Sequence, residues 1–217
     1  MRREFLHYFM LLLIIFYFTG TLITLKKYCP KKLKTYVLIS AVLGIVSFST
    51  QFYISLAPQQ TYINSLKPLI FMNNLVDVFL ILISFYIFLR KEKLAFKWMY
   101  LFMGIISIIF IIGMFLVQSI VKVDKIYGYK LILLNDFEYR ITFIAVLVIL
   151  TAIMIIFIDY KYSLKISFIL LLVVTIAMIG ENLLYMANIS LFPYPIISEL
   201  LLVNLFSYAM YRTRKTN

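Results

Sequence analysis

Acidic residues, cysteine and histidine are scarce in this chain of 217 residues. It contains nine Asp and Glu residues, one cysteine (Cys29) and one histidine (His7). A single cysteine cannot form an internal disulfide, and one cysteine with one histidine cannot build a zinc site of the usual Cys/His kind. Only 14% of the residues are charged, against about 25% in a soluble domain, which excludes an ordinary soluble enzyme and a disordered protein.

The motifs of the common catalytic classes are also missing. The chain has no Walker lysine motif, no H-E-x-x-H pair and no G-x-S-x-G turn. A Ser–His–Asp catalyst would have to use His7, which stands alone. The sequence therefore predicts no cofactor and no metal site. A membrane-embedded enzyme that acts on lipid is the least favoured of three functional hypotheses.

Hydrophobic residues dominate what is present, at 64% of the chain with a mean hydropathy of +1.01. Such a chain buries its apolar surface in lipid or in a permanent partner. A spanning helix needs about 20 apolar residues, and backbone groups in lipid must be paired within the segment. We therefore predict an all-α, multi-pass bundle in one membrane domain, residues 1–217, with seven spans over 4–25, 35–56, 68–89, 98–120, 140–158, 164–188 and 194–211.

The net charge of +12 comes largely from short basic runs between these segments. This distribution is typical of cytoplasmic loops and predicts an outside N-terminus and a cytoplasmic C-terminus. The expected location is the plasma membrane. It does not favour nucleic acid as a partner. The basic inner loops are instead expected to contact a cytoplasmic or membrane protein. The first segment lacks a cleavage site, so we expect a retained helix and not a signal peptide.

Two of the connections are long, and both are predicted to lie outside, at residues 57–67 and 121–139. The second contains Tyr127, Gly128 and Tyr129, and tyrosine favours the depth of the membrane interface. This connection is expected to be either a helix lying in the interface or a plain loop.

Three carboxylates lie inside the predicted spans, namely Asp77, Glu181 and Glu199. An ionisable residue at the centre of a spanning helix costs at least about 2.5–3.5 kcal/mol on insertion scales, which makes each one a candidate functional residue. All three would fall between the midplane and the outer surface. Amide side chains accompany them, namely Asn73, Asn74, Asn182 and Asn204.

If these faces converge, they form an acidic cavity open to the outside. Such a cavity would suit a proton, a cation, an amine or a basic peptide. The structural alternative is that the amides hold helices together by hydrogen bonds of about 0.6–2 kcal/mol each. Asp136 and Arg140 stand four residues apart and are predicted to form an ion pair at the outer interface.

The layout resembles the seven-helix sensory module of certain prokaryotic membrane histidine kinases. The similar features are the third helix ending in Tyr86-Ile-Phe-Leu-Arg90-Lys91-Glu92-Lys93 and the outer Tyr127-Gly128-Tyr129 segment. The resemblance implies a receptor-like or accessory sensor module that signals to a cytoplasmic partner. The chain stops at Asn217 without a kinase domain, so a free-standing receptor or partner subunit is expected.

The alternative is a small transporter or permease subunit in which Asp77 and Glu181 bind a cation or a proton. The many Lys, Ile, Phe and Asn residues, with few Gly and Pro, are typical of a bacterial source.

Overall fold

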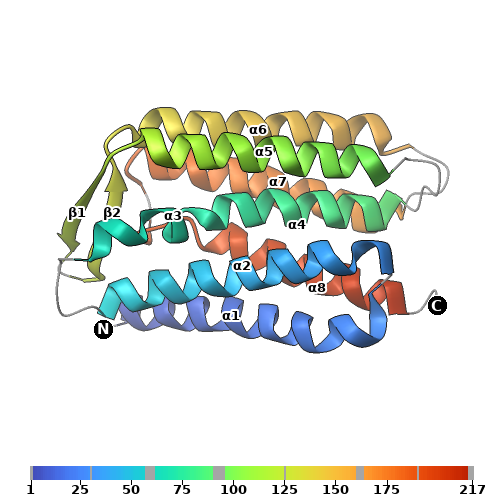
Figure 1. The fold of residues 1–217 in the computed structure, drawn as a ribbon, viewed down its shortest axis with the longest axis horizontal. Coiled ribbons are helices and arrows are strands. Elements are labelled where there is room, and N and C mark those ends of the chain that lie inside the picture. The colour runs from blue at the N-terminus through green and yellow to red at the C-terminus, as the bar shows by residue number, and fades with distance from the viewer. Residues whose placement is uncertain are drawn as a thin grey trace.

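The computed structural model describes residues 2–29, 31–56, 62–89, 96–124, 126–159, 164–189 and 191–214. Over these residues the chain is almost entirely helical, with one short sheet. The helices run along the long axis of the molecule (Figure 1), and their bounds are α1 (Arg2–Tyr28), α2 (Lys31–Leu56), η1 (Ile63–Leu66), α3 (Lys67–Ile70), α4 (Met72–Leu89), α5 (Phe96–Leu116), α6 (Asp136–Phe157), α7 (Lys165–Met186) and α8 (Ile197–Arg214).

Six helical segments are long and apolar enough to cross a membrane. Five of them lie in α1, α2, α5, α6 and α7, and the sixth joins η1, α3 and α4 over Ile63–Leu89. This confirms the predicted helical fold and is compatible with a multi-pass membrane protein. The seventh predicted span coincides with α8, whose apolar part, Ile197–Tyr211, is shorter than the others. A seventh crossing stays a prediction.

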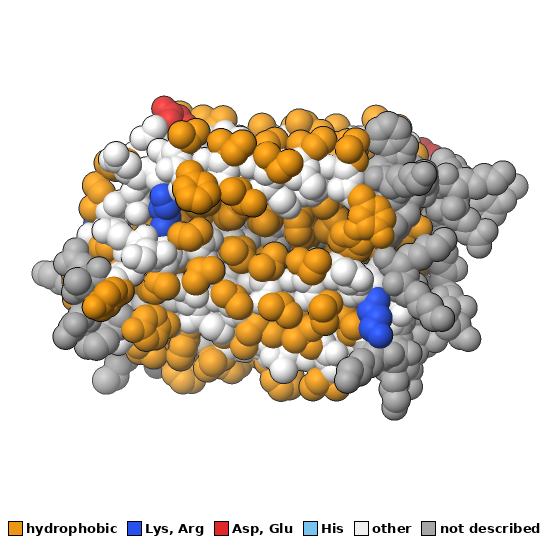
Figure 2. Space-filling view, viewed as in Figure 1, with side chains coloured by type: hydrophobic (Ala, Val, Ile, Leu, Met, Phe, Trp, Pro, Cys, Tyr) orange, Lys and Arg blue, Asp and Glu red, His pale blue; other side chains and the backbone are white. Residues whose placement is uncertain are grey.

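The surface has the distribution of side chains that lipid contact requires. Large apolar residues such as Ile108, Phe115 and Ile156 are exposed along the helices. Figure 2 shows that apolar side chains cover the face between the two ends, while the Lys and Arg side chains visible in this view lie towards the ends. Polar residues such as Ser47, Asn73 and Thr175 are buried inside instead. The bundle therefore presents an apolar belt to its surroundings, as a membrane protein must.

Helix α4 occupies the centre of the bundle and α5 its edge. α4 packs against α2, α7 and α8, and it belongs to the most buried of the six candidate spans. α5 is the least buried of them, and its main neighbours are α4 and α3. The central position explains why a polar side chain on α4 meets protein and not lipid.

The helix that contains Pro68 is interrupted just before the polar residues of α4. In a continuous helix the N–H of Asn74 would donate to the Ile70 carbonyl. Here it donates to the Phe71 carbonyl (3.3 Å), which frees the Ile70 oxygen. That oxygen accepts from Ser47 Oγ and Gln51 Nε2, both at 3.2 Å, on α2. Side chains of a neighbouring helix thus satisfy the backbone at the break, as lipid could not.

A β-hairpin stands where the sequence predicted an interfacial helix or a plain loop. Strands β1 (Ser119–Asp124) and β2 (Gly128–Leu133) pair antiparallel, so both readings of residues 121–139 were wrong. The predicted span at 98–120 ends earlier as a consequence, at Leu116. The physical signals are Asp124 and Gly128, which stand at the two sides of a short turn, and the β-branched residues Ile120, Val121 and Val123 before it.

The turn of the hairpin is closed by local hydrogen bonds. The Asp124 carboxylate accepts from the backbone N–H of Ile126 (2.7 Å) and of Tyr127 (3.3 Å), and Gly128 has a φ of +76°. The hairpin lies at the end of the bundle where α1 begins (Figure 1), which we call the hairpin end. A side chain at Gly128 would overlap the Ser55 carbonyl at the end of α2. The hairpin is therefore held against α2.

The orientation in the membrane stays a prediction. It depends on basic residues in the connections, and residues 26–27, 90–97 and 161 lie outside the described side chains.

Substituting Gly128 by alanine is expected to loosen the hairpin. The positive φ and the Ser55 carbonyl both oppose a Cβ, so Gly128→Ala should lower the free energy of unfolding by more than about 1 kcal/mol. Denaturation in detergent micelles measures this quantity. Gly104→Ala is the matched control, because its Cβ meets nothing within 4 Å. Equal stability of the two variants would contradict the docking of the hairpin.

Candidate functional site

The three carboxylates singled out in the sequence lie in one region of the bundle. Asp77 is in the second turn of α4, Glu199 is in the first turn of α8, and Glu181 is near the end of α7. Because α4 and α8 begin and α7 ends at the hairpin end (Figure 1), all three are at a similar depth. Asp77 interacts electrostatically with Glu181, and Glu199 interacts with both. We call these residues the carboxylate cluster.

Glu181 caps the first turn of α8. Its carboxylate accepts from the backbone N–H groups of Ile197 (3.1 Å) and Ser198 (2.7 Å) and from Ser198 Oγ (2.5 Å). The first N–H groups of a helix have no partner within the helix, and its N-terminus attracts negative charge. Glu181 is therefore fixed by a structural contact, and its side chain is only half-buried.

Asp77 and Glu199 are more deeply buried and have fewer partners. Asn73 Nδ2 donates to Glu199 Oε1. The other Glu199 oxygen and both carboxyl oxygens of Asp77 are buried without a hydrogen-bond partner. Over the part of the chain that the structure describes, no Lys or Arg side chain forms an ion pair with either residue. The cluster thus contains three acidic oxygens that protein atoms leave unsatisfied.

Arg140 is a buried cation next to this region. Its Nε donates to Asp136 (2.9 Å), which confirms the predicted i,i+4 pair. The guanidinium also donates to Asn182 Oδ1 (3.0 Å) and lies over the Tyr185 ring, 3.7 Å from its centroid. The sequence missed these contacts with α7, since only the helix packing brings α6 and α7 together. Asn182 therefore joins α7 to α6.

A small cavity lies beside Glu181 at the hairpin end. Its volume is about 80 Å³, and its lining includes Glu181, Tyr185 and Tyr194. Lys130 Nζ of β2 is 4.6 Å from the Tyr185 ring centroid and 5.9 Å from that of Tyr194. Burial, and the nearby charge of Arg140, lower the pKa of Lys130 to about 8. The carboxylate cluster is thus flanked at this end by two cationic side chains.

The remaining predicted residues do not join the cluster. Asn74 donates to the Tyr139 hydroxyl (3.0 Å) and faces α6, whereas Asn204 is exposed on α8. His7 is fully buried under the hairpin, where its ring packs edge-on against Tyr127, with 5.3 Å between the centroids. Only Asn73, of the four amides, contacts a cluster carboxylate.

Within the described ranges, no group of three or more His, Cys, Asp and Glu residues is arranged to hold a metal ion. The cluster offers acceptors for a proton or for a hydrogen-bond donor. Comparison with protein-family models, with curated proteins and with solved structures finds no match for this chain. The resemblance to sensory modules of histidine kinases therefore stays an expectation from layout.

Removing the Arg140 guanidinium is expected to destabilise the packing of α6 on α7. Breaking a buried ion pair costs about 3 kcal/mol or more, so Arg140→Ala should lower the free energy of unfolding by about that amount. Arg140→Lys should not restore it, because an ammonium cannot reproduce the planar, multi-donor geometry that reaches Asp136 and Asn182. Lys122→Ala, at an exposed position of β1, is the control and should change stability by less than about 0.5 kcal/mol.

The lowered pKa of Lys130 predicts a defined pH dependence of stability. Between about pH 8 and pH 10.5 the folded state has lost the proton that the unfolded state still binds. Stability therefore rises with pH across this window, relative to a Lys130→Met variant. Unfolding curves of both proteins over pH 7–11 measure the difference. Parallel pH profiles would contradict the burial of the amine.

Proposed function

We propose that this chain is a small proton-dependent transport protein of the plasma membrane, in which Asp77 and Glu199 form the proton-binding site. The observation that carries the proposal is the Asp77 carboxyl group, whose two oxygens are both buried and without a hydrogen-bond partner. This develops the transporter alternative from the sequence, with a proton as the bound ion.

The energetics of burial support a bound proton. An isolated ionised carboxylate in an apolar interior is so unfavourable that the group takes up a proton instead. Asp77 also has two acidic neighbours, and like charges at close range cannot all ionise. Glu181 has three donors that stabilise its charge, and Glu199 has one. Asp77 has none, so it is the preferred site for the proton.

The surroundings of the cluster support proton exchange from the hairpin end. Glu181 lines the small cavity there and is half-buried, whereas Asp77 and Glu199 are buried and do not line it. Lys130 and Arg140 stand at the same end and would repel a metal cation. A proton can instead move along hydrogen-bonded groups. With the predicted N-terminus outside, this exchange would take place with the external side.

The interruption before α4 supports a conformational step. Asn73 and Asp77 follow the break at Phe71 by less than two turns. Discontinuous helices commonly carry the binding sites of secondary transporters, because a broken helix can move in two parts. The hydrogen bonds of Ser47 and Gln51 to the Ile70 carbonyl would form one closed arrangement of this hinge.

A sensor module is the second candidate, favoured by the contacts of the hairpin. Tyr127 packs on His7 of α1, its hydroxyl donates to the Leu191 carbonyl (2.9 Å), and Gly128 lies against α2. A hairpin that contacts α1, α2 and the α7–α8 connection would transmit a change at this end to several helices. Such a module would signal to a cytoplasmic or membrane partner.

Replacing Asp77 by asparagine is expected to abolish proton movement. In liposomes that contain a pH-sensitive dye, an imposed pH gradient should drive proton uptake by the wild-type protein. Uptake by Asp77→Asn should fall to the level of protein-free liposomes, because an amide cannot exchange the proton. The infrared band of a protonated carboxyl group should disappear in the same variant.

Asp159→Asn is the matched control, since its side chain is 93% exposed and lies beyond the end of α6. It should retain wild-type flux and the infrared band. Unchanged flux and an unchanged band in Asp77→Asn would overturn the proposal. A band that depends on Asp77, in a protein without flux, would favour the sensor.

A further inference from the structure

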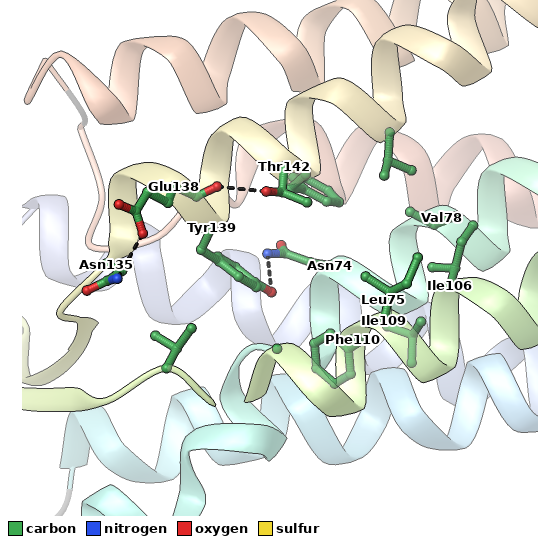
Figure 3. A pocket seen from close by; sticks show the side chains of 14 residues that line it. Asn74, Leu75, Val78, Ile106, Ile109, Phe110, Asn135, Glu138, Tyr139 and Thr142 are labelled. Atoms are coloured by element: carbon green, nitrogen blue, oxygen red, sulfur yellow. Dashed lines mark hydrogen bonds between the residues drawn. The ribbon is translucent and has the colours of Figure 1, made fainter. Parts of the chain in front are cut away.

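A second cavity opens between α4, α5 and α6, away from the carboxylate cluster. Its volume is about 230 Å³. One end is polar and the other apolar, as Figure 3 shows: Asn135 and Glu138 lie at the polar end, and Val78 and Ile106 at the apolar end. All three helices belong to candidate membrane spans, so in a bilayer the cavity would lie at the depth of the hydrocarbon.

The polar end lies at the hairpin end of the bundle. Asn135 precedes the first residue of α6, and its Nδ2 donates to the Glu138 carboxylate (2.8 Å). Behind them the Tyr139 hydroxyl accepts from Asn74 (3.0 Å). Glu138 is exposed and is the only charged residue among those that line the cavity. A headgroup at this end would therefore meet one negative charge and several hydrogen-bonding groups.

The apolar end lies deeper among the spans. From Asp136 to Val146 the rise along α6 is about 15 Å, which is half of a hydrocarbon core about 30 Å thick. The cavity therefore extends over the depth of one leaflet. Its volume is below the roughly 300–1,000 Å³ of typical small-molecule pockets, so it fits a single hydrocarbon chain better than a bulky ring system.

We propose that this cavity binds one hydrocarbon chain of a bilayer lipid, whose amine-bearing headgroup pairs with Glu138. The cavity lies among the candidate spans, where bilayer lipids would surround it. Its length along α6 matches the depth of one leaflet, so a hydrocarbon chain fits it. The single carboxylate at the polar end favours a cationic amine over an anionic headgroup. The site is separate from the carboxylate cluster and does not depend on proton transport.

Gly113 allows the cavity to be filled without disturbing the fold. Gly113 lines the cavity, and a Cβ built there meets nothing within 4 Å. Gly104 lies on the same helix with equally open space, but it is not among the lining residues. Gly113→Leu and Gly104→Leu are therefore a matched pair that differs in access to the cavity.

The test uses phosphatidylethanolamine with a photoactivatable group in one chain, incorporated into vesicles with the full-length protein. Peptide mapping should find cross-links in α5 and α6 of the wild type. Gly113→Leu should lower this labelling about tenfold, the factor that 1.4 kcal/mol of lost affinity gives, and Gly104→Leu should leave it unchanged. Gly113→Ala and Gly113→Val should lower the labelling by smaller, graded amounts. These two variants replace Gly113→Leu in the test if the leucine variant folds poorly.

The headgroup is tested with phosphatidylglycerol that carries the same photoactivatable chain. The wild type should label several times more weakly with this anionic probe, and Glu138→Gln should remove the difference between the probes. Equal labelling of Gly113→Leu and Gly104→Leu would identify ordinary surrounding lipid and overturn the site. Equal labelling of the wild type by both probes would overturn the amine-bearing headgroup.

Discussion

A polar group inside a bilayer must find its partner within the protein, because hydrocarbon offers none. This requirement explains why helices fill the described structure. It also explains the threonines that fold back on their own helices: the hydroxyls of Thr50, Thr151 and Thr175 each donate to the carbonyl four residues earlier. Where the helix breaks at Phe71, the freed Ile70 carbonyl is satisfied from α2. The helices pack in the arrangement that lets these partners meet.

The same requirement makes the carboxylate cluster unusual. Glu181 is fully engaged by the first turn of α8, and Arg140 by Asp136, Asn182 and the Tyr185 ring. Asp77 is an exception at the centre of the bundle, with both carboxyl oxygens unsatisfied by protein atoms. Both nitrogens of His7 are also buried without a partner, but an imidazole can be buried neutral, whereas a buried carboxylate needs a partner for its charge. The smallest ligand that neutralises a carboxylate is a proton.

Hydropathy predicted most of the fold, but it could not predict the hairpin. Residues 119–133 are apolar enough to be read as the end of a span and an interfacial segment, whereas the Asp124 turn and the β-branched neighbours make them strands. Asp77, Glu181 and Glu199 were found because charge within an apolar run is conspicuous. Gln51 and Ser47 were not, since uncharged polar residues are common in spans and their role arises from a break in another helix.

The sequence by itself determined the helical class, the apolar segments long enough to cross a membrane, and the carboxylates that these segments contain. Hydropathy and charge are properties of each segment alone, so they can be calculated from the sequence without knowing how the helices pack. Tertiary structure decided which polar groups meet, because that depends on how each helix is rotated about its axis. Asn73 and Glu199 are 126 residues apart yet hydrogen-bonded, while Asn74, one position away, turns to α6 and Asn204 faces outward.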